Sequence, residues 1–194
     1  MSRDRNNLQR HIEECLADHR EMRDRYGRLW PTETWDDETL GTDILGSPKG
    51  RKMKIYVASS WRNEHQPEVV RVLRSMGHEV YNFRNPRKGD NGFHWSEIDP
   101  AWESWTPERY RECLSHPTAV AGFTSDMDAL KWCEAVVAVQ PFGRSASLEL
   151  GWAAGMGKLT VLLLATGEPE LMVKMCDHVC VEIEEVLTAL ETPW

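Results

Sequence analysis

Hydrophobic residues from position 53 onwards gather in short, almost uninterrupted runs, and stretches of helical periodicity separate these runs. The runs predict buried strands at residues 53–58 and 79–83, from Ala135, and at residues 159–164 and 179–183. The amphipathic stretches predict helices at residues 66–76, 108–114, 123–133 and 184–190, over the segment that carries Glu149, and briefly between the last two strands. Residues 85–106 fit neither pattern and predict a long irregular insertion.

Strands that are apolar on both faces and separated by helices are typical of a parallel sheet covered on both sides. Because crossovers between parallel strands are right-handed, the order of elements predicts a doubly wound α/β fold. The expected architecture is a flavodoxin-like, five-stranded parallel sheet with helices on both faces, formed by residues 51–194.

The N-terminal region has a different pattern. Apolar residues recur at near-helical spacing between charged ones: Leu8, Ile12, Leu16, Met22 and Tyr26. We expect an amphipathic helix that ends before Pro31 and docks on its own domain or on a partner subunit. Residues 1–50 are therefore predicted to be a helix followed by a loose connector.

The composition excludes several classes of protein. A formal net charge of −8 argues against binding to a nucleic acid polymer, but it leaves room for a single nucleotide. No apolar run approaches the roughly 18 residues that a membrane helix needs, and the N-terminal residues lack the apolar core of a signal peptide. We therefore expect a cytoplasmic protein without a membrane partner.

The cysteines do not predict a disulfide framework, because their number, five, is odd and they are scattered. The segment with Cys176, Asp177, His178 and Cys180 invites comparison with a metal site. The alternation of side chains along a strand would divide these groups between two faces, however, so a structural role is expected and no metal is predicted.

Polar groups follow the predicted strands at the edge where parallel sheets place ligands. Tyr56, Ser59 and Trp61 come from the first strand and its loop. Asp126 is expected at a helix start, where capping the helix is the alternative role. Glu149 lies in the first turns of the helix after the third strand.

Three segments carry a resemblance: KIYVASSW, SDMDALKWCEAVVAV and GRSASLELGWAAGMGK. Over about residues 53–164 the chain resembles the nucleoside 2-deoxyribosyltransferase family and its relatives that hydrolyse nucleoside monophosphates. The resemblance implies that Glu149 is a nucleophile, that Tyr56 orients it, and that Asp126 assists departure of the base. It also implies a homodimer or larger homo-oligomer and a nucleoside or nucleotide as the small-molecule partner, and no cofactor is expected.

This set of residues suits the chemistry. Cleavage of an N-glycosidic bond passes through an oxocarbenium-like state, which an adjacent carboxylate such as Glu149 can attack or stabilise. The leaving base needs a proton, for which Asp126 is the first candidate and Asp128 the second. The reaction ends in hydrolysis or in transfer of the sugar to another base, and the sequence leaves both outcomes open.

One departure from the family pattern bears on the substrate. Many deoxyribosyltransferases carry an aspartate near the position of Gly143, where it grips the sugar 5′-hydroxyl. Here Arg144, Ser145 and Ser147 follow at a predicted helix N-terminus, an arrangement that attracts a phosphate. We therefore expect a nucleoside 5′-monophosphate.

The insertion adds aromatic residues, including His94 and Trp95. They predict either a lid that stacks on the base or a small core that holds the loop in place. Trp61 is a further candidate for contact with the base, and His94 could donate a proton. The alternative function is a nucleotide-binding sensor without catalysis, which signals through the N-terminal helix. A flavin carrier is disfavoured, because the loop after Ala58 lacks a run rich in Ser, Thr and Gly.

Overall fold

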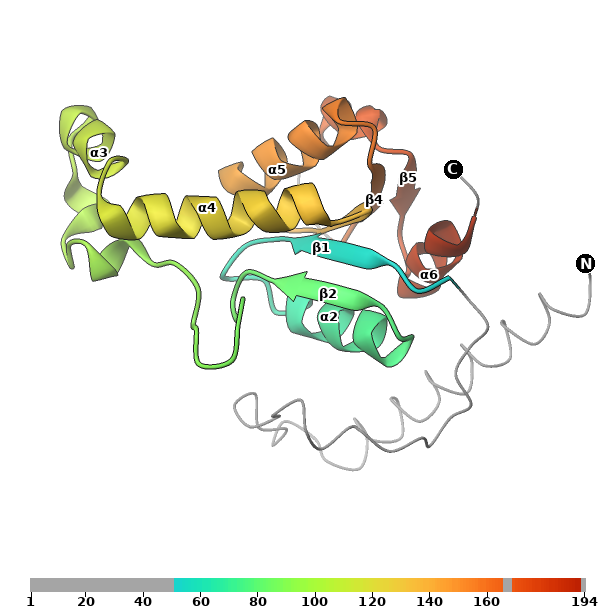
Figure 1. Ribbon diagram of the computed structural model, residues 1–194. Helices are drawn as coiled ribbons and strands as arrows, with labels where there is room; N and C mark the ends of the chain where they lie inside the picture. Colours follow the sequence, from blue (N-terminus) through green and yellow to red (C-terminus); the bar gives the residue numbers. More distant parts are fainter. Residues whose placement is uncertain (1–50, 166–168, 193–194) are drawn as a thin grey trace, which may run out of the picture. The chain divides into compact units, whose positions relative to one another are not determined.

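The computed structural model describes residues 51–165 and 169–192, so the expected N-terminal helix and the boundary near residue 50 lie outside the described residues. Five parallel strands form one sheet in the order β2-β1-β3-β4-β5 (Figure 1). The strands are β1 (Lys54–Ala58), β2 (Glu79–Asn82), β3 (Ala135–Val139), β4 (Leu159–Leu163) and β5 (His178–Cys180). The flavodoxin-like prediction is confirmed.

Helices connect the strands and cover both faces of the sheet. They are α2 (Gln66–Ser75), α3 (Pro107–Cys113), α4 (Pro117–Trp132), α5 (Arg144–Gly155) and α6 (Ile183–Glu191), with short 3₁₀ turns η2 (Trp95–Glu97), η3 (Trp102–Ser104) and η4 (Leu171–Met175). Figure 1 shows α4 and α5 on one side of the strands and α2 and α6 on the other. Every residue of β3 is buried, as expected for a central strand covered on both faces.

Two boundaries differ from the sequence prediction. Helix α4 begins at Pro117 rather than at residue 123, because proline suits a first helical turn and the His116 imidazole accepts from the Thr118 amide at 3.3 Å. Asp126 therefore lies in the middle of α4, and the prediction that it stands at a helix start is wrong. Strand β5 ends at Cys180, since the next amide, that of Val181, donates to the Glu185 carboxylate at 2.7 Å instead of to a neighbouring strand.

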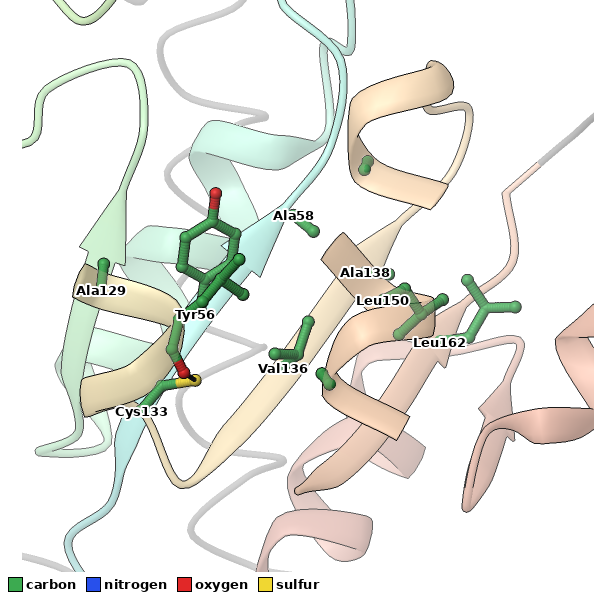
Figure 2. Close-up of a cluster of buried hydrophobic side chains, with 11 residues drawn as sticks. Tyr56, Ala58, Ala129, Cys133, Val136, Ala138, Leu150 and Leu162 are labelled. Atoms are coloured by element: carbon green, nitrogen blue, oxygen red, sulfur yellow. Dashed lines mark hydrogen bonds between the residues drawn. The ribbon is translucent and has the colours of Figure 1, made fainter. Parts of the chain in front are cut away.

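The core between the sheet and the α4–α5 layer contains the largest fully buried side chain, that of Tyr56. Strand alternation places Tyr56, Val136 and Leu162 on this face, where they meet Ala129 of α4 and Leu150 of α5 (Figure 2). The phenol ring runs along β1, and its hydroxyl points toward the carboxyl end of the strand (Figure 2). The Tyr56 hydroxyl is thus a polar group at the carboxyl end of the sheet, supported by an apolar core.

Candidate active site

The strand order reverses direction between β1 and β3, since β1 connects outward to β2 and β3 connects outward to β4. Loops leaving these two strands diverge, and the crevice outside their carboxyl ends is where doubly wound proteins bind ligands. The first strand ends at Ala58 and the third at Val139. Candidate residues predicted from the sequence, such as Ser59 and Gly143, lie in the loops that follow these two strands.

A buried asparagine joins the two loops at this point. The Asn63 side chain is 1% exposed, and its Nδ2 donates to the carbonyls of Val139 at 2.9 Å and Pro141 at 3.0 Å. Its Oδ1 accepts from the amides of His65 at 2.7 Å and Gln66 at 3.2 Å, so it also holds the chain where α2 begins. Sequence reasoning missed Asn63, because a lone asparagine in a loop gives no signal of its partners.

Ser59 belongs to the same junction. Its hydroxyl donates to the Val139 carbonyl at 2.8 Å, so this candidate binding residue ties the end of β1 to the end of β3. The Val139 carbonyl accepts from both Ser59 and Asn63. Val139 is the last residue of β3, and the loop toward α5 begins after it.

Glu149 lies in the second turn of α5 and is half-buried. Burial, followed by the nearby negative charge of Asp126, raises the pKa of Glu149 to about 7, while its interaction with the Tyr56 hydroxyl opposes this rise. The structure therefore brings Glu149, Asp126 and Tyr56 within electrostatic reach of one another. A carboxyl group that titrates near neutrality is suited to chemistry at that pH.

The Tyr56 hydroxyl is fully buried. Within residues 51–165 and 169–192 it makes no hydrogen bond that meets the usual limits of distance and angle. Burial and then the charges of Glu149 and Asp126 raise its pKa, so the phenol stays protonated and remains a donor. A buried donor without a complete bond is costly, and Glu149 is the first acceptor beside it. Burial thus leaves a neutral donor beside the Glu149 carboxylate.

Asp126 is hydrogen-bonded to a second tyrosine, Tyr81. The Tyr81 hydroxyl donates to Asp126 Oδ1 at 2.8 Å and lies 3.1 Å from the Ser125 hydroxyl. Burial raises the pKa of Asp126; the Tyr81 hydrogen bond opposes this rise, and the charge of Asp90 adds to it. Asp126 thus holds a proton more readily than an ordinary aspartate.

Tyr81 and Asp90 are site residues that sequence reasoning missed. Tyr81 pairs in register with Tyr56 on the neighbouring strand, and the two rings stack with centroids 5.2 Å apart and planes 18° apart. Two tyrosines in neighbouring parallel strands were a usable signal, but only the strand register places them side by side. Asp90 lies in the loop after β2, where its carboxylate accepts from the Gly92 amide at 2.9 Å.

The N-terminus of α5 is formed as the sequence predicts. Gly143 is its extended N-cap residue and supplies no side chain to the first helical amides. Arg144 and Ser145 are exposed at the first turn, while the Ser147 hydroxyl donates back to the Gly143 carbonyl at 3.2 Å. Uncapped amides beside an arginine form an electropositive helix end on the same helix as Glu149.

Part of the insertion faces the loop after β1. The rings of His94 and Trp61 lie 4.2 Å apart between centroids at an angle of 40°, and Phe83 meets Trp61 edge-on at 5.1 Å. Trp61 remains 41% exposed, so part of its ring is free to contact a ligand. Arg84 secures this group, because its Nη2 donates to the carbonyls of Ser60, Trp61 and Asn63 at 2.8, 3.0 and 2.7 Å.

The rest of the insertion forms a small aromatic cluster. Trp95 packs edge-on against Phe93 at 4.7 Å and against Trp105 and Tyr110 at 5.6 Å each. Phe93 in turn lies so close to Gly122 of α4 that an added Cβ there would sit 2.8 Å from it. Trp95 thus belongs to the core that holds the insertion, whereas His94 is on the side of Trp61.

The Asp177 carboxylate accepts from both the amide and the hydroxyl of Thr160 at 2.8 Å, which ties β5 to β4.

Over the part of the chain that the structure describes, no group of three His, Cys, Asp or Glu side chains is arranged to hold a metal ion. Nor does any helix in that part have the length and apolar character needed to cross a membrane.

No family model and no curated protein matches the chain. Among solved structures, a 2-deoxyribosyltransferase from Bacillus psychrosaccharolyticus is similar, with 23% identity, a TM-score of 0.47, and coverage of 72% of this chain and 98% of that one. The CMP N-glycosidase of Clostridium botulinum is similar with 21% identity, a TM-score of 0.39, and coverage of 70% and 95%.

Proposed function

We propose that the protein cleaves the N-glycosidic bond of a nucleoside 5′-monophosphate, with Glu149 as the nucleophile. The observation that carries the proposal is the arrangement of two half-buried carboxylates at the switch point of the sheet. Glu149 is beside the Tyr56 hydroxyl and Asp126 beside the Tyr81 hydroxyl, and each carboxyl has a raised pKa. Two carboxyl groups with different partners suit the two roles that glycosidic cleavage requires.

In the first step an oxygen of Glu149 forms a bond to the anomeric carbon while the bond from that carbon to the base breaks. The electron pair of the broken bond stays on the base nitrogen, which takes a proton from Asp126. In the second step water attacks the anomeric carbon and gives a proton to Asp126, and Glu149 departs as a carboxylate. A second base in place of water would give sugar transfer instead.

The protonation states fit this division of labour. Glu149 must be ionised to attack, which its pKa of about 7 permits in an appreciable fraction of molecules at neutral pH. Tyr56 stays neutral because of its raised pKa, and it can stabilise the ionised carboxylate in one orientation. Asp126 must give a proton to the base, and its raised pKa makes the protonated form more common than in an ordinary aspartate.

The start of α5 supports a phosphorylated substrate. Arg144 and Ser145 are exposed beside uncapped helical amides, and Glu149 follows on the same helix. A 5′-phosphate at this helix end would place the attached sugar toward Glu149. In this proposal Trp61 and His94 contact the base, while Ser59 and Trp95 hold the surrounding loops.

The direct test is base release from ribo- and deoxyribonucleoside 5′-monophosphates and from the free nucleosides, with and without an acceptor base. Loss of release in Glu149→Ala and Glu149→Gln would support the nucleophile. Activity restricted to free nucleosides would refute the phosphate assignment. Nucleotide binding without any release would replace the enzyme with the binding-module alternative.

Arg144→Ala tests the phosphate contact separately. The expected result is a KM for monophosphates raised by about 10-fold or more, with little change for the free nucleoside, since a charge-assisted phosphate contact contributes about 1.5–3 kcal/mol. Arg71→Ala is the matched control, because Arg71 forms an exposed ion pair with Glu68 on α2. An equal loss toward both substrates in Arg144→Ala would contradict the assignment.

A further inference from the structure

Tyr81 is the one side chain with a full hydrogen bond to Asp126 among the described residues. It comes from β2, the edge strand, whereas Tyr56 comes from β1 beside it. The two phenols share a register position and stack at 5.2 Å, so the position of the Tyr81 ring is fixed by a buried neighbour. The Tyr81 hydroxyl therefore reaches Asp126 from a rigid support.

We propose that Tyr81 is a positioning residue whose hydroxyl fixes one oxygen of Asp126 and stabilises that group in its ionised form. The catalytic role of Tyr81 rests on the proposed function, whereas the hydrogen bond from Tyr81 to Asp126 does not depend on it. It assigns a role to a residue outside the three segments that carry the resemblance.

The direction of the hydrogen bonds follows from the number of protons. An ionised Asp126 can only accept, so the single phenol proton of Tyr81 goes to Oδ1 at 2.8 Å. Ser125 then donates its own proton to the phenol oxygen at 3.1 Å. The resulting order, Ser125 to Tyr81 to Asp126, leaves the second carboxylate oxygen available for the proton exchanged with the base.

This order assists the proton transfer. When Asp126 gives its proton to the departing base nitrogen, negative charge appears on the carboxylate, and the hydrogen bond from Tyr81 becomes charge-assisted. An interaction that strengthens as the charge develops lowers the barrier more than it stabilises the bound substrate. Removing the hydroxyl should therefore reduce kcat and leave KM little changed.

The groups that face Asp126 come from several elements. Tyr56 from β1, Tyr81 from β2, Asp90 from the following loop and Glu149 from α5 all interact with it. On its own helix the neighbouring Asp128 is exposed and faces Lys131 at 3.8 Å. Because Asp90 and Glu149 are acidic, Tyr81 is the group in this set that opposes protonation of Asp126 through a formed hydrogen bond.

Tyr81→Phe keeps the stacked ring and removes only the hydroxyl. The first measurement is a carbon-13 titration of aspartate carboxyls, with Asp126 assigned by its absence in Asp126→Asn. The pKa of Asp126 is expected to rise in Tyr81→Phe and to stay unchanged in Tyr110→Phe, whose phenol is exposed on α3. An unchanged pKa of Asp126 in Tyr81→Phe would overturn the proposal.

The second measurement is kinetic, on whichever nucleotide the wild-type protein cleaves. A fall in kcat of about 10-fold or more, a KM within about twofold, and a basic limb of the pH profile shifted to higher pH are expected for Tyr81→Phe. Wild-type kcat and profile in this variant would overturn the catalytic part. If the wild type cleaves nothing, the proposed function fails, and the titration alone still decides whether Tyr81 controls Asp126.

Discussion

Tyr56 and Tyr81 stand opposite each other on neighbouring strands, stacked at 5.2 Å, and their hydroxyls serve different carboxyl groups. Tyr81 donates to Asp126, while Tyr56 interacts with Glu149. The stacked rings come from neighbouring strands, whereas the two acids come from the separate helices α4 and α5. The two interactions have distinct consequences for how the site responds to pH.

The acid limb of the pH profile should report Glu149. Since only its ionised form attacks, kcat/KM is expected to rise with pH through about 7, the pKa that burial and Asp126 produce. Asp126→Asn removes a negative neighbour, so it should lower the pKa of Glu149. Because this variant also lacks the proposed acid, the measurement is a carbon-13 titration of glutamate carboxyls from pH 5 to 9, with Glu149 assigned by its absence in Glu149→Gln. An unchanged pKa of Glu149 would contradict the coupling.

Tyr56→Phe should move the acid limb of the pH profile to higher pH. The Tyr56 hydroxyl lowers the pKa of Glu149, so its removal leaves burial and the Asp126 charge less opposed. We expect a limb at higher pH and a rate reduced by about 10- to 100-fold, because the carboxylate also loses its orienting donor. A shift to lower pH would show that the phenol does not stabilise the ionised form.

Glu149→Gln should stabilise the protein at neutral and alkaline pH. The pKa of Glu149 is about 7 in the folded protein against an ordinary 4.5, so the folded state binds more protons and loses stability as pH rises from about 4.5 to 7. The neutral amide avoids this loss, which is on the order of 1–3 kcal/mol above pH 7 and vanishes below about pH 4.5. Urea unfolding at pH 4 and pH 8 measures the difference, and the exposed Glu103→Gln serves as the control.

Gly92→Ala should disturb the loop that holds Asp90. Its φ of +73° is unfavourable for alanine, and the added Cβ would lie 2.2 Å from the Phe83 carbonyl oxygen. Gly89→Ala is a matched control with a φ of +79° and open space around it. Both variants carry the cost of positive φ, about 1 kcal/mol, so Gly92→Ala should lower the Tm further. Equal Tm values would mean that the loop yields freely at this position.

Asn63→Ala should be among the most destabilising changes at the strand ends. It removes two donated and two accepted hydrogen bonds from a side chain that is 1% exposed, and it leaves buried backbone groups unpaired. A loss of about 2–4 kcal/mol in the free energy of unfolding is expected. The exposed Asn85→Ala should lose less than about 0.5 kcal/mol, and a similarly small loss in Asn63→Ala would refute its role as a junction.

The sequence predicted the parts of this protein that depend on local patterns. The five strands and their helices follow from apolar runs such as that beginning at Ala135, and the placement of Glu149 after β3 follows from the parallel order. It misplaced the start of α4, because the residues between Pro117 and Phe123 are mostly small and give no clear helical periodicity. Asp126 was identified as a candidate despite that error, since its distance from β3 along the chain did not change.

The residues that were missed depend on contacts between distant segments. Asn63, Tyr81 and Asp90 each take their role from a partner on another element, and no spacing within a single segment reveals it. Trp95 illustrates the same limit from the other side. Its type suggests base stacking as readily as packing, and only its neighbours Trp105 and Tyr110 show that its ring lies inside a cluster.

The three carbonyls gathered around Arg84 have a mechanical consequence. Arg84 follows β2, whereas Ser60, Trp61 and Asn63 belong to the loop after β1, so one guanidinium fastens two adjacent rims of the crevice. Neither rim can shift without stretching bonds to the other. The two loops are therefore expected to move together, and Asn63 links them to the end of the central strand β3. A ligand in contact with the exposed part of Trp61 would lie against a rigid surface.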